Sequence, residues 1–267
     1  MRSFPDIVYV ERKEGLLALD LFLPTSTAPT GLIVFVHGGG FAKGSRKSEF
    51  VTSLAERLAT HGLATAAVGY RLNAGASLPR SQKRAVRANR SHAFEAGVNL
   101  RPRLIGPRFE VARQDIGTAL AFLRTSSVPE ELIGLNIGMI GVSAGGIAGL
   151  ALVHPPDNLP RYDGPICLIT LGAALVHPWA IRKTAAPCLM LHSAQDRVIS
   201  PKNNDILRPF IAESGAPISQ HTCSRRGHNA PMAALMQDDA PDGTPYWNSA
   251  LDLFEKADLL NQGPASV

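Results

Sequence analysis

Cysteine is one of several features that are scarce in this chain of 267 residues. Only three cysteines occur, and they are widely spaced: Cys167, Cys188 and Cys223. A disulfide framework or a structural metal site requires more thiols at closer and more regular spacing. Each of the three lies in or beside an apolar stretch, so we expect buried free thiols and no metal site.

Long apolar runs are also missing. No segment reaches the roughly 20 apolar residues of a membrane span, and residues 1–15 lack the apolar stretch of a secretory signal. We therefore expect a cytoplasmic protein with no membrane partner. Hydrophobic residues still make up 45% of the chain, which is enough for a sizeable buried core.

Acidic residues are scarce in one place, the segment 80–108. It carries eight basic side chains against one acid, Glu95, and so has a charge of +7 in a chain whose total is +5. A nucleic-acid-binding protein more often spreads its basic residues over a whole face, with aromatic side chains between them. We therefore expect no nucleic-acid partner. The segment is either a solvated surface stretch or a lid that attracts anionic substrates or an acidic partner.

Strand-like and helix-like stretches alternate along most of the chain. Continuous apolar runs and period-two alternation predict strands, and apolar residues at helical spacing predict helices. The predicted strands lie within 1–15, 16–24, 31–40, 63–70, 135–142, 165–172, 186–196 and 217–223. The predicted helices span 48–60, 110–124 and 144–154. This alternation predicts one α/β domain over 1–267, with a mostly parallel sheet of about eight strands, helices on both faces and an antiparallel hairpin at one edge.

The connection 71–109 is much longer than most loops, so we expect it to contain helices of its own or to have a role. It includes the basic segment, and we predict that it is an insertion that can act as a small lid.

A serine lies among small residues where a predicted strand gives way to a predicted helix. Residues 141–145 read Gly-Val-Ser-Ala-Gly, and a sharp strand-to-helix turn needs small neighbours because the two elements converge there. The turn exposes the hydroxyl of Ser143, and the free N–H groups at the start of the helix point toward it. Such a hydroxyl can attack a carbonyl group and stabilise the resulting oxyanion. A simple packing turn is the alternative.

Three consecutive glycines follow His37 at the end of an earlier predicted strand. Their N–H groups can approach a bound oxygen closely, and donors placed where charge develops stabilise a transition state by about 3–4 kcal/mol each. A phosphate-binding loop is the alternative. The chain, however, has neither Gly-Lys-Ser/Thr at this place nor a G-x-G-x-x-G that opens a helix.

Two further residues fit the partners that a nucleophilic serine requires, namely a base and an acid that orients the base. Asp196 ends a predicted strand, and His228 lies in a loop after the last predicted strand. The order Ser143, Asp196, His228 is that of the α/β-hydrolase fold. Asp205 is a weaker candidate for the acid because it lies in a later loop or helix.

Four motifs together resemble those of a known group of enzymes. They are HGGGF at 37–41, GVSAGG at 141–146, HSAQDRVIS at 192–200 and RGHN at 226–229. They are similar to the corresponding segments of α/β-hydrolase esterases. More narrowly, they resemble the HGGG-containing carboxylesterases, near the hormone-sensitive-lipase-like group and the small acetyl-esterase and kynurenine-formamidase-like enzymes.

The resemblance implies a role for each of these residues. Ser143 would be the nucleophile, His228 the base and later the acid, and Asp196 the residue that orients His228. The backbone N–H groups implied for the oxyanion hole are those of Gly39, Gly40 and Ala144, with that of Phe41 as a substitute. Phe41 and Trp179 are also expected to line the substrate pocket.

Two positions depart from the hormone-sensitive-lipase-like pattern. Val142 stands where an acidic residue is usual, and Gly69 stands where Asp-Tyr-Arg-Leu usually begins. Both departures bear on the subgroup and not on the triad. Because the predicted strands leave no room for a large cap, the connection 71–109 is the best candidate to cover the site.

The resulting prediction is a serine hydrolase that cleaves short-acyl carboxylic esters without a cofactor. The basic insertion adds an expected tolerance of, or preference for, a negatively charged small-molecule ester. Amides, formamides, lactones and thioesters are alternative substrates for the same triad. A hydrolase-fold protein that binds a ligand without chemistry is the second alternative.

Overall fold

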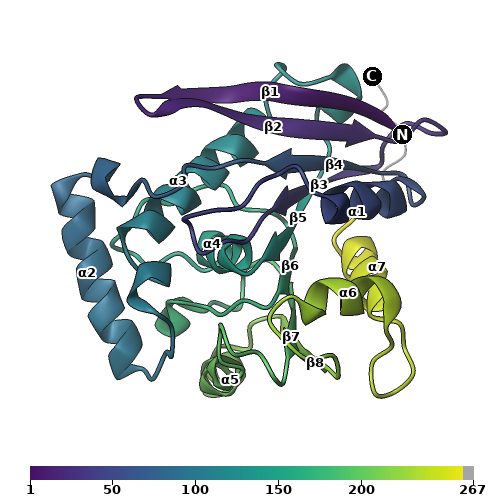
Figure 1. Ribbon diagram of the computed structural model, residues 1–267. Coiled ribbons are helices and arrows are strands. Elements are labelled where there is room, and N and C mark those ends of the chain that lie inside the picture. The colour runs from purple at the N-terminus through teal and green to yellow at the C-terminus, as the bar shows by residue number, and fades with distance from the viewer. Residues whose placement is uncertain (261–267) are drawn as a thin grey trace.

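A computed structural model describes residues 1–260, and an eight-stranded sheet runs through its centre (Figure 1). Its strands are β1 (Arg2–Arg12), β2 (Gly15–Leu23), β3 (Gly31–Val36), β4 (Leu63–Val68), β5 (Ile137–Val142), β6 (Leu168–Leu171), β7 (Cys188–Ser193) and β8 (Ile218–Cys223). They are arranged in the order β1-β2-β4-β3-β5-β6-β7-β8. β2 is antiparallel to both of its neighbours, and every other pair is parallel. The prediction of a mostly parallel sheet with an antiparallel hairpin at one edge is confirmed.

Helices cover both faces of the sheet, and each face has its own apolar core. α1 (Glu49–Ala59), α6 (Ala230–Gln237) and α7 (Tyr246–Lys256) pack on one face. α3 (Pro107–Phe122), α4 (Ala144–Val153) and α5 (Lys202–Ser214) pack on the other. The predicted helices at 48–60, 110–124 and 144–154 correspond to α1, α3 and α4.

The centre of the molecule is the most deeply buried part. Every residue of β3, β4 and β5 is buried, and so is every residue of α4 except its last. α4 is built almost wholly from glycine, alanine and aliphatic residues, so it can lie against the sheet on one side and under α3 on the other. The turn between β5 and α4, which holds Ser143, is therefore anchored in the core at both ends.

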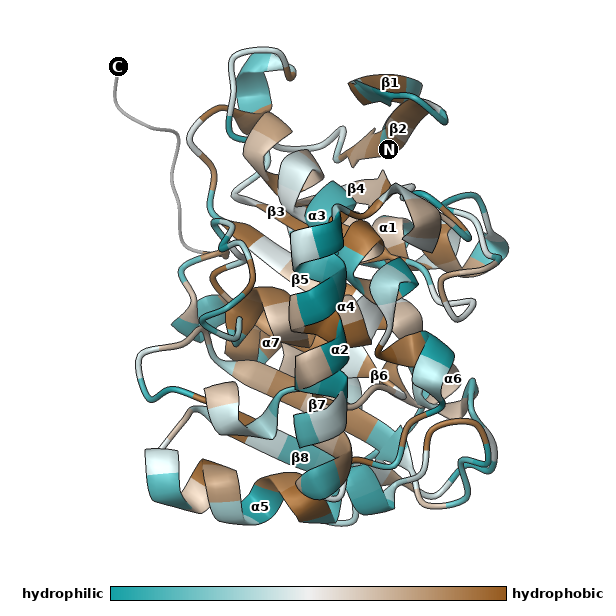
Figure 2. Cartoon of the chain, turned by 90° about the vertical axis from the view of Figure 1, so that its left-hand side faces the viewer, coloured by the Kyte–Doolittle hydropathy of each residue, from teal (hydrophilic) through white to brown (hydrophobic). Residues whose placement is uncertain are grey.

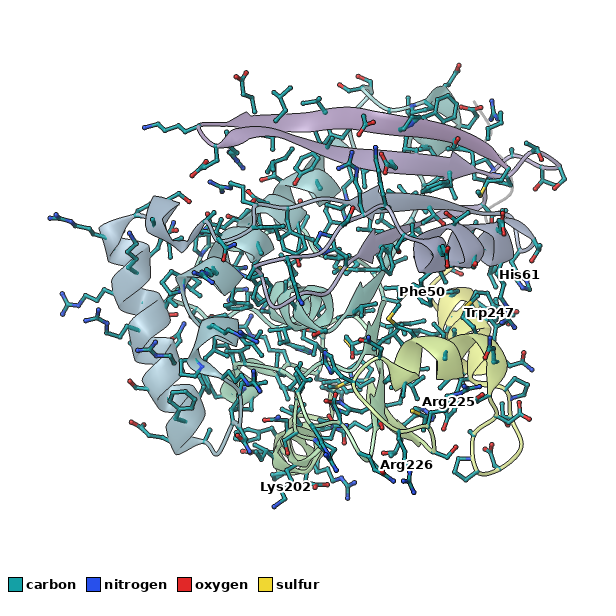
Figure 3. The ribbon with its side chains drawn as sticks, viewed as in Figure 1. Phe50, His61, Lys202, Arg225, Arg226 and Trp247 are labelled. Carbon is teal, nitrogen blue, oxygen red and sulfur yellow. The ribbon has the colours of Figure 1, made fainter. Side chains whose placement is uncertain are left out.

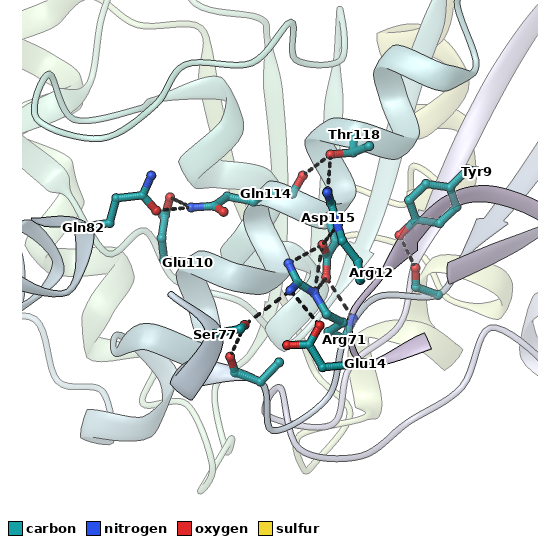
Figure 4. Close-up of polar contacts among 12 residues, drawn as sticks. Tyr9, Arg12, Glu14, Arg71, Ser77, Gln82, Glu110, Gln114, Asp115 and Thr118 are labelled. Atoms are coloured by element: carbon teal, nitrogen blue, oxygen red, sulfur yellow. Dashed lines mark hydrogen bonds and ion pairs between the residues drawn. The ribbon is translucent and has the colours of Figure 1, made fainter. Parts of the chain in front are cut away.

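The connection 71–109 contains α2 (Arg80–Glu95) and two short 3₁₀ turns at Gly75–Ser77 and Pro102–Leu104. Figure 2 shows α2 as a largely hydrophilic helix in front of the apolar α4. Polar contacts join the connection to the rest of the molecule, as Figure 4 shows for Arg71, whose guanidinium donates to the fully buried Asp115 on α3. Gln114 of α3 likewise donates to Gln82 of α2 at 2.8 Å. Movement of this connection as a lid stays a prediction.

The helices α5, α6 and α7 have no counterpart in the sequence analysis. The apolar spacing of Trp247, Ala250 and Phe254 is the signal that identifies α7. Trp247 lies beside His61, which follows α1 (Figure 3), and donates its indole N–H to the imidazole at 3.2 Å. The guanidinium of Arg57 lies 4.1 Å from the centre of the Trp247 ring, a cation–π arrangement that helps to join α7 to α1.

The three cysteines are free and buried, as predicted. Within residues 1–260, no helix combines the length and the apolar character that crossing a membrane requires.

Candidate active site

Ser143 occupies the turn between β5 and α4 in a strained backbone conformation. Its φ is 50° and its ψ is −115°, a combination that non-glycine residues rarely adopt. Its N–H donates to the carbonyl of Leu171 on the neighbouring strand β6 at 2.9 Å. Close packing also restricts the turn, because a Cβ at Gly145 would lie 2.3 Å from the carbonyl oxygen of Val36. The strand-to-helix turn predicted from the sequence is therefore present and requires its glycine.

A continuous chain of hydrogen bonds joins Ser143 to His228 and Asp196. The Nδ1 of His228 lies 2.7 Å from Asp196 Oδ2, and its Nε2 lies 2.8 Å from Ser143 Oγ. An ionised carboxylate can only accept, so Nδ1 carries the proton and donates it to Asp196. Nε2 of the neutral ring then accepts from the serine hydroxyl. The structure thus brings together the three residues that the sequence analysis singled out.

Strand direction explains this convergence. β5 and β7 run parallel, so Ser143 and Asp196 follow them at the same edge of the sheet, and the loop between β8 and α6 brings His228 to that edge. Asp205, the weaker candidate for the acid, lies exposed on α5, where its carboxylate pairs with Arg208 at 3.2 Å. Asp205 and Arg208 therefore form an ion pair on the surface, away from the site.

Asp196 is the most heavily hydrogen-bonded group of the site. Its Oδ1 accepts from the backbone N–H groups of Val198 and Ile199, at 2.7 and 3.0 Å. Its Oδ2 lies 3.2 Å from Nε2 of His192 as well as near His228. Burial alone raises the pKa of the Asp196 carboxyl, but the hydrogen bonds from His192, His228 and the two N–H groups outweigh it, so that the pKa lies well below its usual value. The carboxylate is therefore ionised when it faces His228.

The contact between His192 and Asp196 was missed by sequence reasoning, which gave His192 no role at the site. Its Nε2–H also donates to the carbonyl of Ile199 at 3.0 Å, so this histidine joins both ends of the loop that carries the acid. The four-residue separation between His192 and Asp196 is the only signal in the sequence, and it occurs too often by chance to be informative.

The glycine loop after β3 lies directly against Ser143. A Cβ at Gly38 would stand 3.1 Å from the Cβ of Ser143. Within residues 1–260, the backbone N–H groups of Gly39, Gly40 and Ala144 donate to no other group, so they are available to an oxygen bound beside the serine. Gly39 has a φ of 108°, which glycine adopts without strain.

His37 and Tyr70 hold the glycine loop in place. His37 donates from Nδ1 to the carbonyl of Gly38 at 2.7 Å, and the ring of Tyr70 stacks on its imidazole with centres 4.4 Å apart. The Tyr70 hydroxyl donates to the carbonyl of His37 at 3.0 Å. Burial lowers the pKa of His37, with a smaller contribution from Arg46, which favours the neutral ring.

A cavity of about 560 Å³ opens beside Ser143 and His228. Apolar side chains of Leu104, Val198 and Met232 form part of its wall. Its charged wall residues are Lys43, Arg101 and Arg103. Sequence reasoning had named Ser143, His228 and the glycines of the loop, which all belong to this wall, but it had singled out none of the three cations.

The structure corrects the expectation that Phe41 and Trp179 line this cavity, because neither is among its wall residues. The side chain of Phe41 is fully buried and packs edge-on against Tyr70 and Phe109. Trp179 stacks on His92 of α2, with ring centres 3.8 Å apart, and lines a separate surface hollow. Arg103 and Leu104 of the turn at Pro102–Leu104, with Arg101 just before it, form part of the cavity wall instead. No group of three or more potential metal ligands occurs among residues 1–260.

Known proteins resemble this chain in fold. The model of the BD-FAE family, an α/β-hydrolase family, matches residues 19–101, which include the glycine loop. No curated protein matches the sequence. Esterase 2 of Thermogutta terrifontis, phosphonylated by cyclosarin, is similar with a TM-score of 0.67 and 17% identity, over 96% of this chain and 95% of that one.

Two further structures give the same result. The propionate-bound form of the Thermogutta terrifontis esterase has a TM-score of 0.65 and 17% identity, over 96% of this chain and 95% of that one. A truncated carbohydrate esterase from gut microbiota has a TM-score of 0.66 and 14% identity, over 97% and 96% of the two chains. Together with the strand order, these likenesses show the α/β-hydrolase fold.

Proposed function

Because the chain has the α/β-hydrolase fold, we propose that it is a serine hydrolase that cleaves carboxylic esters through an acyl-enzyme on Ser143. The observation that carries this proposal is the chain of hydrogen bonds from Ser143 Oγ through His228 to Asp196. Nucleophilic acyl transfer needs a hydroxyl whose proton can pass to an oriented imidazole.

The first half of the reaction forms the acyl-enzyme. Ser143 Oγ attacks the ester carbonyl carbon while Nε2 of His228 takes the hydroxyl proton. The carbonyl oxygen becomes an oxyanion that accepts hydrogen bonds from the free N–H groups of Gly39, Gly40 and Ala144. When the tetrahedral intermediate collapses, the bond to the alkoxy oxygen breaks. His228 returns its proton to this oxygen, and the alcohol leaves.

The second half releases the acid. A water molecule gives a proton to His228 and attacks the acyl carbon, and the same N–H groups stabilise the second oxyanion. Collapse of this intermediate returns the proton to Ser143 Oγ and frees the carboxylic acid. Asp196 stays ionised throughout and holds the imidazole in the orientation that both halves need.

A short acyl chain is the finer part of the proposal. A cavity of only about 560 Å³ supports small substrates. The likeness to an esterase structure that holds propionate supports the same view. Amides, formamides, lactones and thioesters present the same carbonyl carbon, so they are the substrates to compare with esters.

A fluorophosphonate probe tests the proposed nucleophile, since it reacts with an activated serine. We expect stoichiometric labelling of the protein at Ser143, read by mass spectrometry, and none in Ser143→Ala. Ser45→Ala is the matched control, because Ser45 also lines the cavity, but its hydroxyl accepts from the N–H of Lys47 and, within residues 1–260, makes no hydrogen bond to a histidine. The likeness to an esterase that cyclosarin phosphonylates supports this choice of probe.

The outcome that would contradict the proposal is a folded, unlabelled wild-type protein that hydrolyses no ester in a panel of aryl acetates, butyrates and octanoates. That result would favour a hydrolase-fold protein that binds a ligand without chemistry. Within an active panel, we expect acetate and butyrate to be cleaved faster than octanoate. Aryl amides, lactones and thioesters in the same assay identify the preferred leaving group.

A further inference from the structure

The cavity beside Ser143 is lined by charges of one sign. Lys43, Arg101 and Arg103 contribute to its wall, and no aspartate or glutamate does. Within residues 1–260, none of these three cations lies within 4.0 Å of a carboxylate oxygen or donates a side-chain hydrogen bond. A cleft lined by unpaired cations attracts anions and raises their local concentration.

Several other arginines of this protein are paired with carboxylates. Arg71 is held by Asp115, Arg113 by Glu110, and Arg225 by Asp238. The exposed Asp157 forms ion pairs with two arginines, Arg161 and Arg182. Within residues 1–260, Arg84 and Arg87 of α2 also have no carboxylate partner, so what distinguishes Arg101 and Arg103 is their place in the cavity wall.

The backbone that carries the two cavity arginines is held firmly. They flank Pro102 in the 3₁₀ turn, where Leu104 is 2% exposed and anchors the turn in the core. Just before the turn, the side chain of Asn203 accepts from the N–H of Asn99 at 2.8 Å and donates to its carbonyl at 3.1 Å. The side chains of Arg101 and Arg103 are exposed and line the cavity, so a fixed backbone presents two solvent-accessible guanidinium groups there.

One of the two arginines, Arg103, is close to the reacting centre. Nε of Arg103 would lie 3.9 Å from a Cβ at Gly40, one of the glycines proposed to bind the oxyanion. The remaining cations of the basic segment lie outside the cavity wall: Arg80, Lys83, Arg84, Arg87, Arg90 and Arg108. Of the eight basic residues in the segment 80–108, two therefore line the cavity that contains the proposed oxyanion site, and the other six do not.

We propose that Arg101 and Arg103, assisted by Lys43, bind an anionic group of the substrate, so that the site prefers esters that carry a carboxylate over neutral esters. Guanidinium groups suit this role because their planar N–H pairs match the two oxygens of a carboxylate. The inference rests on the proposed ester hydrolysis. The inference concerns only a charged group of the substrate that is not part of the ester bond to be cleaved.

The test compares matched substrates in which the charge lies on one side or the other of the ester. On the acid side, the monoanionic 4-nitrophenyl hydrogen adipate is compared with 4-nitrophenyl hexanoate. On the alcohol side, 4-acetoxybenzoate is compared with 4-acetoxybenzamide. The measured quantity is the ratio of kcat/KM for the anionic ester to kcat/KM for its neutral partner, at an ionic strength of about 0.15 M, where the Debye length is about 8 Å.

The variants remove equal charge from two places in the same segment. We expect Arg101→Gln/Arg103→Gln to lower the anionic-to-neutral ratio by about tenfold on at least one side of the ester. Arg84→Gln/Arg87→Gln, on the exposed surface of α2, is the matched control and should keep the ratio within about twofold, because distant exposed charges are screened. The proposal is overturned if the cavity variant leaves both ratios unchanged, or if the control lowers them equally.

Binding of adipate, measured by calorimetry, separates this inference from the proposed function because it needs no turnover. We expect adipate to bind wild-type protein and the α2 variant alike, and to bind Arg101→Gln/Arg103→Gln about tenfold more weakly. If no ester is cleaved and Ser143 is not labelled, the hydrolase proposal fails while this binding difference can still hold. Equal adipate binding by all three proteins overturns the anion site even when neutral esters are cleaved.

Discussion

The two ends of α4 differ in how their buried polar side chains are satisfied. Ser143 precedes the helix and is 7% exposed, and His154 ends it and is fully buried. The hydroxyl of Ser143 bonds to His228, which bonds in turn to Asp196. Neither ring nitrogen of His154 has a hydrogen-bond partner within residues 1–260. Burial alone therefore does not distinguish a reactive group, whereas a continuous set of partners does.

The same contrast appears in the electrostatics of the two ends. Burial works against the charge of Asp196, yet the surrounding donors lower the pKa of its carboxyl and keep it ionised. Burial also works against the charge of His154, and nothing compensates, so its pKa falls to about 4, with Arg182 adding to the effect. Near the first end of α4 the buried Asp196 is therefore kept ionised, whereas at the other end the buried His154 is kept neutral.

Asp196→Asn should have the largest effect of the substitutions considered, because it removes the buried charge at the first end of α4. An amide at this position can donate to Nδ1 of His228, which favours the wrong tautomer and leaves Nε2 unable to accept the serine proton. We expect kcat/KM to fall by about 10⁴-fold, with little change in the unfolding midpoint.

Asp205→Asn is the matched control, since Asp205 is an exposed aspartate that faces Arg208. We expect wild-type kcat/KM for this variant. If Asp205→Asn lost activity while Asp196→Asn kept it, the assignment of the acid would be wrong.

Glycine packing provides a second comparison between the ends of α4. At the first end, a Cβ at Gly145 would meet the backbone of Val36 at 2.3 Å, and backbone atoms cannot move aside locally. At the other end, a Cβ at Gly164 would lie 3.4 Å from the carbonyl of Leu152, an ordinary contact. We expect Gly145→Ala to lower the free energy of unfolding by about 3 kcal/mol or more, and Gly164→Ala to change it by less than about 1 kcal/mol.

Urea unfolding followed by circular dichroism measures both variants. A Gly145→Ala protein as stable as wild type would show that the turn can relax. The short distance between position 145 and the backbone of Val36 would then not explain why residue 145 is a glycine.

Local patterns were sufficient to predict the first end of α4 from the sequence. Small residues around Ser143, bounded by an apolar strand and a helix, indicate a sharp turn whatever the rest of the chain does. The choice of Asp196 over Asp205 followed from its place at the end of a strand. These features depend on neighbours in sequence, so sequence reasoning reaches them.

Contacts between distant segments could not be predicted in the same way. Trp179 lies against His92 because α2 packs beside it, and no local pattern encodes that packing. The short turn at Pro102–Leu104 carries no regular pattern, so the sequence indicated a basic insertion without showing which arginines reach the cavity. The complete burial of His154 likewise depends on the segments that close over the end of α4.

The pH dependence of stability tests the second end of α4. In the unfolded chain, the pKa of a histidine is near 6.5, whereas in the folded protein that of His154 is about 4. Between these values the unfolded state binds a proton that the folded state does not, so stability is complete above pH 6.5 and falls as the pH decreases toward 4. From pH 8 to about pH 5, this one group should lower the free energy of unfolding by about 2 kcal/mol.

His154→Leu should remove that part of the loss, because leucine fills the apolar site without titrating. Urea unfolding at pH 8 and at about pH 5 gives the difference for each protein, and His177, whose pKa burial also lowers, contributes equally to both. His221→Leu, on the edge strand β8, controls for replacing a histidine elsewhere and should lose as much stability as wild type. An equal loss in wild type and His154→Leu would mean that this end of α4 accommodates a charged imidazole, and the contrast with Asp196 would disappear.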